Sequence, residues 1–266
     1  MILALFLRNL RHHARLLVAM MLGLGVFEVL ILWVAAKIDE GAGLREFLES
    51  ILPEGAQEAV FSQFGLVSFP GAVAFGFVHP VAIVAATAFV VVVATVPAAE
   101  RETGFLDLVL ARPVPRGRYL LAVVLLLVLG AVLLPLALLG GAALGLGIVD
   151  VEDRLPLARY VPAAFGLGFL LLAVGGYSLL FAAGARRRGP AIGRAVALTL
   201  AFYVVEYLAD FWDLLDRIRW VSPFHYYKPI AAAVVPDTPL VNPVVLLAAF
   251  VVLAAAAHLR FRRQDL

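Results

Sequence analysis

The sequence predicts an all-α integral membrane protein with six transmembrane helices and both termini in the cytoplasm. Composition is the first basis for this. Hydrophobic residues make up 64% of the chain and charged residues 15%, with a mean hydropathy of +1.01, whereas soluble domains are about 45–50% apolar and about 25% charged. Length is the second, because 266 residues accommodate six spans of about 20 residues with short connections. We therefore interpret residues 1–266 as a single membrane domain.

Six apolar runs supply the spans. The basic residues 1–15 are expected to form an interfacial helix that leads into the first span. Residues 64–77 contain Gly and Pro and are too few to cross a bilayer, so we expect an interfacial or re-entrant segment there. The third run continues to residue 149, and Pro135 is expected to kink it. The predicted spans are residues 16–36, 78–97, 119–139, 160–185, 194–210 and 241–258.

The distribution of basic residues orients these spans. With the N-terminus inside, the cytoplasmic segments carry about twice as many Lys and Arg residues as the segments on the other side, and the excess occurs in all four inner segments. The basic connector at 186–194 and the tail after residue 258 then both lie in the cytoplasm. The same rule places the segment between the second and third spans on the cytoplasmic side.

That segment, residues 98–118, is a polar island between two long apolar runs. It carries seven charged side chains, each of which costs about 2.5–3.5 kcal/mol at the centre of a bilayer, so it must lie outside the hydrocarbon. Pro97 is expected to end the helix before it, and prolines 113 and 115 to stop the helix within it. An apolar stripe predicts a short amphipathic helix at the membrane surface; its members are Phe105, Leu106, Val109 and Leu110.

The segment also resembles a known family. Glu-Arg-Glu-Thr-Gly at 100–104, Leu-Asp-Leu-Val-Leu at 106–110 and Ala-Arg-Pro-Val-Pro-Arg at 111–116 are similar to the cytoplasmic coupling segment of permease subunits of ABC-2 type ABC transporters. In that family this segment docks on a separate ATPase subunit. The resemblance implies ATPase-coupling roles for Glu100, Arg101, Glu102, Thr103, Gly104, Asp107, Arg112 and Pro113.

The resemblance carries further implications. Two six-span permease subunits, identical or different, would pair in a prokaryotic cell membrane, each on one ATPase chain, and export a substrate. Residues 222–229, Ser-Pro-Phe-His-Tyr-Tyr-Lys-Pro, are similar to the family's region before the last span, where short helices dip into the outer leaflet. The ending Phe-Arg-Arg-Gln-Asp-Leu at 261–266 resembles the family's basic tail.

The sequence argues against an enzyme. A phosphate-binding P-loop needs Gly-x-x-x-x-Gly-Lys-Ser/Thr, and neither lysine of the chain, Lys37 or Lys228, lies in such a motif. We expect no cofactor in this chain, ATP and Mg²⁺ on the partner ATPase, and no nucleic acid partner. The five histidines lack the His-Glu-x-x-His spacing of a zinc site, and Ser178 lacks a Gly-x-Ser-x-Gly elbow. The alternatives to transport are a membrane anchor or assembly factor and, less favoured, an intramembrane hydrolase.

Two acidic residues fall inside predicted spans, where ionisable side chains are candidates for function. Glu28 and Glu206 each follow the cytoplasmic start of a span by about 12 residues, which places both about 18 Å from that edge. At equal depth they could line one substrate path with Tyr203 and Tyr207. The alternative is that each is protonated or hydrogen-bonded to a neighbouring helix.

Overall fold

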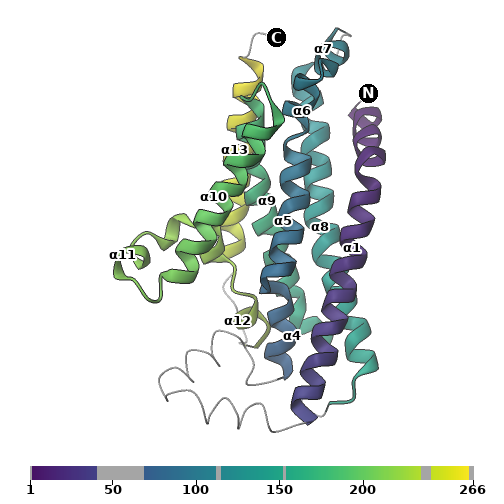
Figure 1. Ribbon diagram of the computed structural model, residues 1–266, viewed down its shortest axis with the longest axis vertical. Coiled ribbons are helices and arrows are strands. Elements are labelled where there is room, and N and C mark those ends of the chain that lie inside the picture. Colours follow the sequence, from purple (N-terminus) through teal and green to yellow (C-terminus); the bar gives the residue numbers. More distant parts are fainter. Residues whose placement is uncertain (1, 41–68, 112–114, 152–153, 235–240, 264–266) are drawn as a thin grey trace.

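The protein forms an elongated bundle of long helices (Figure 1). The computed structural model describes residues 2–40, 69–111, 115–151, 154–234 and 241–263, and no strand occurs in these ranges. Six helical stretches within them are long and apolar enough to cross a membrane, which confirms the predicted all-α class with six candidate spans. These stretches are Ile2–Lys37, Phe69–Ala94, Arg116–Ile148, Leu157–Ala183, Arg188–Leu208 and Asn242–Arg262.

Helix α1 (Ile2–Glu40) is one continuous helix of 39 residues. Residues 2–15, which were expected to form a helix leading into the first span, are helical and continuous with that span. No proline interrupts these residues, and at 1.5 Å per residue the helix is about 58 Å long, well beyond the ~30 Å hydrocarbon core. Its N-terminal turns thus extend past the span and reach the helices that follow the second span.

Helices α4 (Phe69–Val78) and α5 (Pro80–Ala94) form the second span together. The single residue between them, His79, keeps the helical hydrogen-bond pattern: its N–H donates to Phe75 O at 2.8 Å, and its carbonyl accepts from Ile83 N at 3.1 Å. Pro80 is tolerated because the first helical residue needs no N–H partner. For residues 69–77 the re-entrant prediction is therefore wrong, while 64–68 lie outside the described residues.

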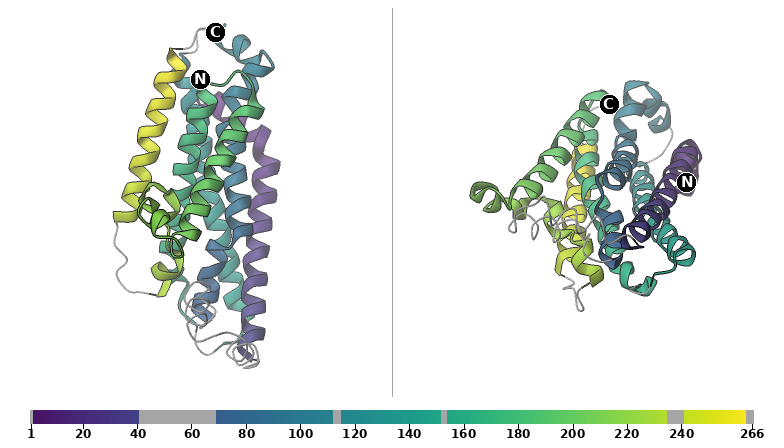
Figure 2. Two further views of the ribbon diagram at one scale, coloured as in Figure 1. Left: turned by 60° about the vertical axis from the view of Figure 1, so that its left-hand side comes forward. Right: turned by 60° about the horizontal axis from the view of Figure 1, so that its bottom comes forward.

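Helix α8 (Arg116–Ile148) is the third span and continues through Pro135 and the Gly-rich stretch that follows. Two of its glycines face α1 of the same chain: a Cβ on Gly141 would overlap the carbonyl oxygen of Gly25, and one on Gly145 would meet Leu32. Glycine allows this close approach because it has no side chain. The two helices lie side by side in both Figure 1 and Figure 2.

The fourth span is the central helix of the bundle and packs against the second, third, fifth and sixth spans. Helix α9 (Val161–Ala183), which follows the 3-10 turn η1 (Leu157–Tyr160), is buried along most of its length and packs against α13 (Val241–Arg262). Helix α10 (Arg188–Leu208) begins six residues earlier than predicted. It diverges from the bundle toward its C-terminal end (Figure 1), and only two of its residues are buried.

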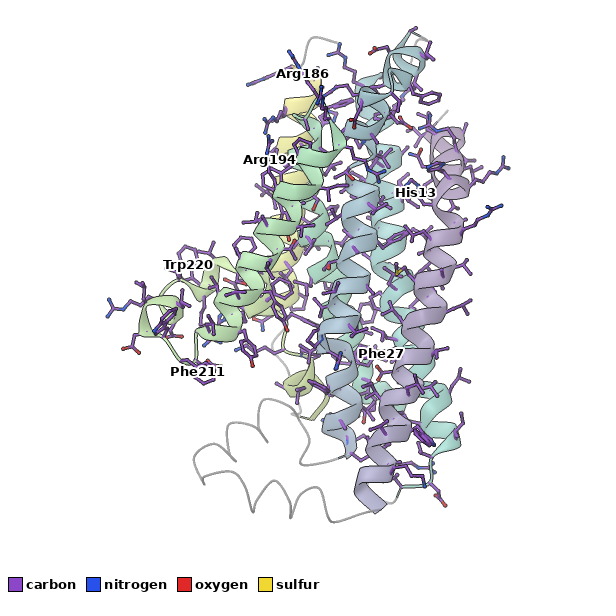
Figure 3. All side chains as sticks on the ribbon, viewed as in Figure 1. His13, Phe27, Arg186, Arg194, Phe211 and Trp220 are labelled. Atoms are coloured by element: carbon purple, nitrogen blue, oxygen red, sulfur yellow. The ribbon has the colours of Figure 1, made fainter. Side chains whose placement is uncertain are left out.

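Short helices connect α10 to α13, as predicted. They are α11 (Asp213–Asp216), η2 (Arg219–Val221), η3 (Pro223–Tyr226) and α12 (Pro229–Val234). Figure 3 shows Phe211 and Trp220 in a part of this region that projects from the bundle, and Phe211, Trp212 and Trp220 are all exposed. Exposed aromatic side chains of this kind are typical of a membrane–water interface.

Both termini lie at the same end of the bundle, together with the helices that follow α5 (Figures 1 and 2). Reporters fused after Leu266 or inserted near Arg188 should therefore give a cytoplasmic signal, because this end carries the basic segments. A reporter near Arg154, in the connection between α8 and α9, should give an external signal. Measuring alkaline phosphatase and fluorescent-protein fusions tests this, and a cytoplasmic signal at Arg154 would contradict the six-span topology.

Candidate coupling site and candidate substrate path

Helix α6 (Val96–Glu102) begins at a break in the second span. Thr95 is fully buried there, and its Oγ1 donates to Val91 O at 2.8 Å and to Val92 O at 3.1 Å. Pro97 lies in the first turn of α6, so the break falls two residues before the proline that was expected to end the helix. A proline in a first turn loses no helical hydrogen bond, and the chain turns here with little cost.

Gly104 joins α6 to helix α7 (Phe105–Leu110). Its φ of 70° and ψ of 3° are left-handed, and it is the one positive-φ glycine among the described residues. Its N–H donates to Arg101 O at 3.1 Å, which ends α6 in the manner typical of a helix C-terminus. A side chain at this position would be strained, so Gly104 fixes the angle between the two helices.

Two of the four residues of the apolar stripe predicted on α7 pack inward. Leu106 is fully buried and Val109 packs against the core. Phe105 is partly exposed, and its ring lies 4.9 Å from the guanidinium of Arg8. Leu108 is 68% exposed, and Thr103 and Asp107 are exposed beside it. The side chain of Leu110 and residues Arg112 and Pro113 lie outside the described part of the chain.

Glu100 joins α6 to α1 and α8. Its Oε1 forms an ion pair with Arg8, and its Oε2 accepts a hydrogen bond from the Tyr119 hydroxyl at 2.6 Å. Tyr119 is fully buried and stacks on Phe261 of α13, with 5.7 Å between the ring centroids. One carboxylate therefore contacts two spans directly and a third through the tyrosine ring.

Arg101 and Glu102 contact the connection between α9 and α10. Arg101 Nη1 donates to Ala185 O at 2.8 Å, and its guanidinium lies 5.7 Å from the Phe261 ring. Burial lowers the pKa of Arg101, but an arginine remains charged at any physiological pH. Glu102 Oε2 accepts from Arg188 N at 2.9 Å, and a carboxylate at this first residue of α10 is stabilised by the helix dipole.

The side chain of Arg188 also binds the C-terminal end of α5. Its Nη2 donates to Val92 O at 3.1 Å, and its Nε approaches Thr95 Oγ1 at 3.4 Å. No pattern in the sequence had indicated that Arg8, Tyr119 and Arg188 belong to this region. Glu100, Arg101 and Glu102, to which the resemblance assigns ATPase coupling, thus bind other segments of their own chain. The exposed tip of α6 and α7 is formed by Thr103, Asp107 and Leu108.

Glu28 lies inside the bundle between α1, α4 and α8. The residue is fully buried, and a Cβ on Gly76 of α4 would overlap its carboxylate. A Cβ on Gly141 of α8 would lie 2.8 Å from Glu28 Cβ. Within the described residues neither carboxylate oxygen has a hydrogen-bond partner. Two glycines therefore make the space for this side chain.

Glu206, Tyr203 and Tyr207 line a cavity of about 430 Å³ between α4, α5 and α10. Glu28 does not line it. Helix α4 lies between them, because Gly76 faces Glu28 while Phe75 and Val78 line the cavity. The structure thus brings together three of the four residues of the predicted path. Glu28 and Glu206 were expected to meet because they lie at equal depth on the first and fifth spans. Helix α4 separates them, and most of that helix had been interpreted as interfacial from the sequence.

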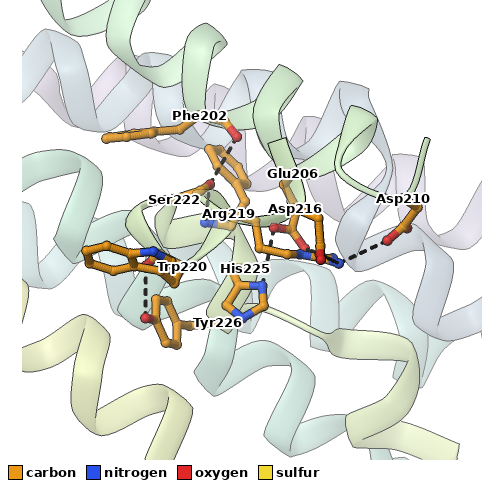
Figure 4. A network of polar contacts seen from close by, with 10 residues as sticks. Phe202, Glu206, Asp210, Asp216, Arg219, Trp220, Ser222, His225 and Tyr226 are labelled. Atoms are coloured by element: carbon orange, nitrogen blue, oxygen red, sulfur yellow. Dashed lines mark hydrogen bonds and ion pairs between the residues drawn. The ribbon is translucent and has the colours of Figure 1, made fainter. Parts of the chain in front are cut away.

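A polar network holds Glu206 at the cavity (Figure 4). Arg219 Nη2 donates to Glu206 Oε1 at 2.8 Å, and its Nη1 donates to Asp210 at 3.0 Å and to Asp216 at 3.2 Å. The hydrogen bond to Glu206 raises the pKa of Arg219 above its usual range. His225 Nδ1 lies 3.4 Å from Glu206 Oε2. Neither Arg219 nor His225 was predicted, because both lie in the mixed segment after the fifth span.

The fold and these contacts define a multi-pass helical membrane protein. Helices α6 and α7 form a helical elbow, and α6 binds several spans through ion pairs and hydrogen bonds. In the described residues no group of three or more His, Cys, Asp or Glu side chains is placed to hold a metal ion. A family model described as "Multidrug efflux system permease Rv1217c, C-terminal domain" matches residues 3–262. The chain therefore belongs to this family of transporter permeases. No curated protein matches the chain.

Proposed function

We propose that this chain is the membrane-spanning subunit of an ATP-driven ABC transporter of the ABC-2 type. It exports its substrate and couples to a separate ATPase subunit through residues 98–118. Family membership supports a permease, and the name of the family, that of a multidrug efflux system, supports export. ATP and Mg²⁺ are bound by the ATPase, and a second permease subunit, identical or different, completes the transporter.

The observation that carries the proposal is the set of contacts made by α6. Glu100 contacts α1 and α8, while Arg101 and Glu102 contact the connection that starts α10. A displacement of this short helix therefore acts on three long helices at once. Such a connection suits a lever that transmits ATPase movement into the membrane, and it lies at the end of the bundle that carries both termini (Figure 1).

The exposed tip of the elbow is where the ATPase would bind. Leu108 is 68% exposed, and burying a leucine side chain at an interface contributes about 1.5–3 kcal/mol. Asp107 and Thr103 flank it with polar groups. A hydrophobic centre with a polar rim is typical of protein interfaces, so a groove on the ATPase that receives Leu108 would account for this exposed leucine.

The replacement Leu108→Glu should reduce association with the ATPase at least about tenfold, since a factor of ten corresponds to 1.4 kcal/mol. The permease is co-expressed with the ATPase encoded nearest to it, and co-purification and ATP hydrolysis are measured. Leu214→Glu is the matched control, because Leu214 is 72% exposed in α11, far from α7. Equal association of both variants and the unmodified protein would contradict the proposed docking site.

A further inference from the structure

The walls of the cavity beside α10 are aromatic. Among the described residues, five aromatic rings line it, from α4, α10, η3 and the residue that follows η3, together with Val78, Pro80 and Ile83. Its inner part is formed by buried side chains, among them Ile83, Phe224 and Tyr227, whereas Tyr207 at its edge is 51% exposed. The aromatic residues are Phe75, Tyr203, Tyr207, Phe224 and Tyr227. A volume of about 430 Å³ is in the range of sites for drug-sized molecules, roughly 300–1,000 Å³.

Among the described residues, the charged groups that line the cavity are two carboxylates, Glu206 and Asp210. Arg219 binds them from outside the cavity, and among the described residues no Lys or Arg belongs to the lining. The same arginine also binds Asp216, so among the described residues one guanidinium contacts three carboxylates. In a site of low dielectric a carboxylate lining favours a cation and disfavours an anion.

Aromatic faces and carboxylates together recognise one class of ligand. The face of a Tyr or Phe ring attracts a cation electrostatically, and the effect is larger in desolvated sites. Apolar groups attached to the cation would bury against the same rings. A neutral sugar would instead need many hydrogen-bonding groups, and an anion would be repelled by Glu206 and Asp210.

We propose that this cavity binds lipophilic organic cations, with the positive charge near Glu206 and Asp210 and the apolar groups against Tyr203, Tyr207 and Phe224. As the site for the exported substrate it rests on the proposed function. Binding itself requires only this chain, so it is measured without an ATPase.

The test uses two ligands of nearly equal size and shape but opposite charge. The purified permease in a non-ionic detergent is titrated with tetraphenylphosphonium and with tetraphenylborate by isothermal calorimetry. Tetraphenylphosphonium should bind at least about tenfold more tightly, because the carboxylates attract one ion and repel the other. Equal affinity, or tighter binding of the borate, would overturn the proposal.

Two variants locate the binding in this cavity. Asp210→Asn should weaken tetraphenylphosphonium binding about fivefold or more, whereas Asp213→Asn should not. Asp213 is the matched control because it is an exposed acid three residues further along that does not line the cavity. Tyr207→Leu removes one exposed ring and should weaken binding by a similar factor. Elution volume and unfolding temperature establish that each variant is folded. Equal affinity of Asp210→Asn, Tyr207→Leu and Asp213→Asn would also overturn the proposal.

A last measurement separates this inference from the proposed function. Leu108→Glu should bind tetraphenylphosphonium with unchanged affinity, because Leu108 lies on α7 and does not line the cavity. A permease that holds its ATPase but binds no lipophilic cation would overturn the cation site and leave the transport function standing. A permease that binds the cation but holds no ATPase would overturn the function alone.

Discussion

Replacing Gly141 with alanine is expected to lower the thermal stability of the permease markedly, although alanine is the better helix former. A Cβ at this position would overlap the carbonyl oxygen of Gly25 and lie 2.8 Å from Glu28 Cβ. The first of these atoms belongs to the backbone of α1 and cannot move without separating α1 from α8. Overpacking of this kind costs about 1–3 kcal/mol or more, against a helix-propensity gain of about 0.8–1.0 kcal/mol.

Neighbouring glycines of α8 provide graded controls. A Cβ on Gly145 would lie 2.6 Å from Leu32 Cδ2, a side-chain atom that has some freedom to shift. A Cβ on Gly140 would meet nothing within 4 Å, and this residue is exposed. The expected order of unfolding temperatures is Gly140→Ala highest, then Gly145→Ala, then Gly141→Ala. The measurement is thermal unfolding in detergent by intrinsic fluorescence. Equal stability of the Gly140 and Gly141 variants would show that α1 and α8 are further apart.

The spans could be predicted from the sequence because the bilayer sets their length and composition. The apolar run that begins at Tyr119 is long enough to cross the hydrocarbon core, so it was predicted as a span. The charges of 98–118 are too costly inside the hydrocarbon, so this segment was predicted to lie outside it. The same reasoning failed for α4. Pro70 and Gly71 lowered its apparent helicity, yet within a membrane a helix is the form that satisfies every backbone hydrogen bond. Residues 69–78 therefore extend the second span.

The contacts of the candidate site could not be predicted, because their partners are distant in the chain. Arg8 and Glu100 are 92 residues apart, Arg101 and Ala185 are 84 apart, and Glu102 and Arg188 are 86 apart. Residue type alone marked 100–104 as unusual and predicted that this segment lies outside the hydrocarbon. It did not reveal which charges bind within the chain, since that depends on how α6 meets the start of α10.

The inward contacts of α6 lead to the prediction with the largest expected effect on transport. In the proposed mechanism, movement of the elbow reaches α10 through the bond from Arg101 Nη1 to Ala185 O and through the contacts of Arg188 with Val92 and Thr95. A hydrogen bond that involves a charged group contributes about 1.5–3 kcal/mol. Its loss would shift an equilibrium that depends on it about tenfold to a hundredfold.

Arg101→Met and Arg188→Gln should therefore each uncouple the transporter: the ATPase remains bound, while ATP-dependent transport falls at least about tenfold. The exposed tip of α7 is unchanged in both variants, which is why association should persist. Arg187→Gln is the matched control, because Arg187 is an exposed arginine next to Arg188. Co-purification and uptake into inverted vesicles measure the two properties separately. Joint loss of binding and transport in the Arg101 variant would place this side chain at the ATPase interface, and undiminished transport in both variants would mean that movement reaches α10 by another route.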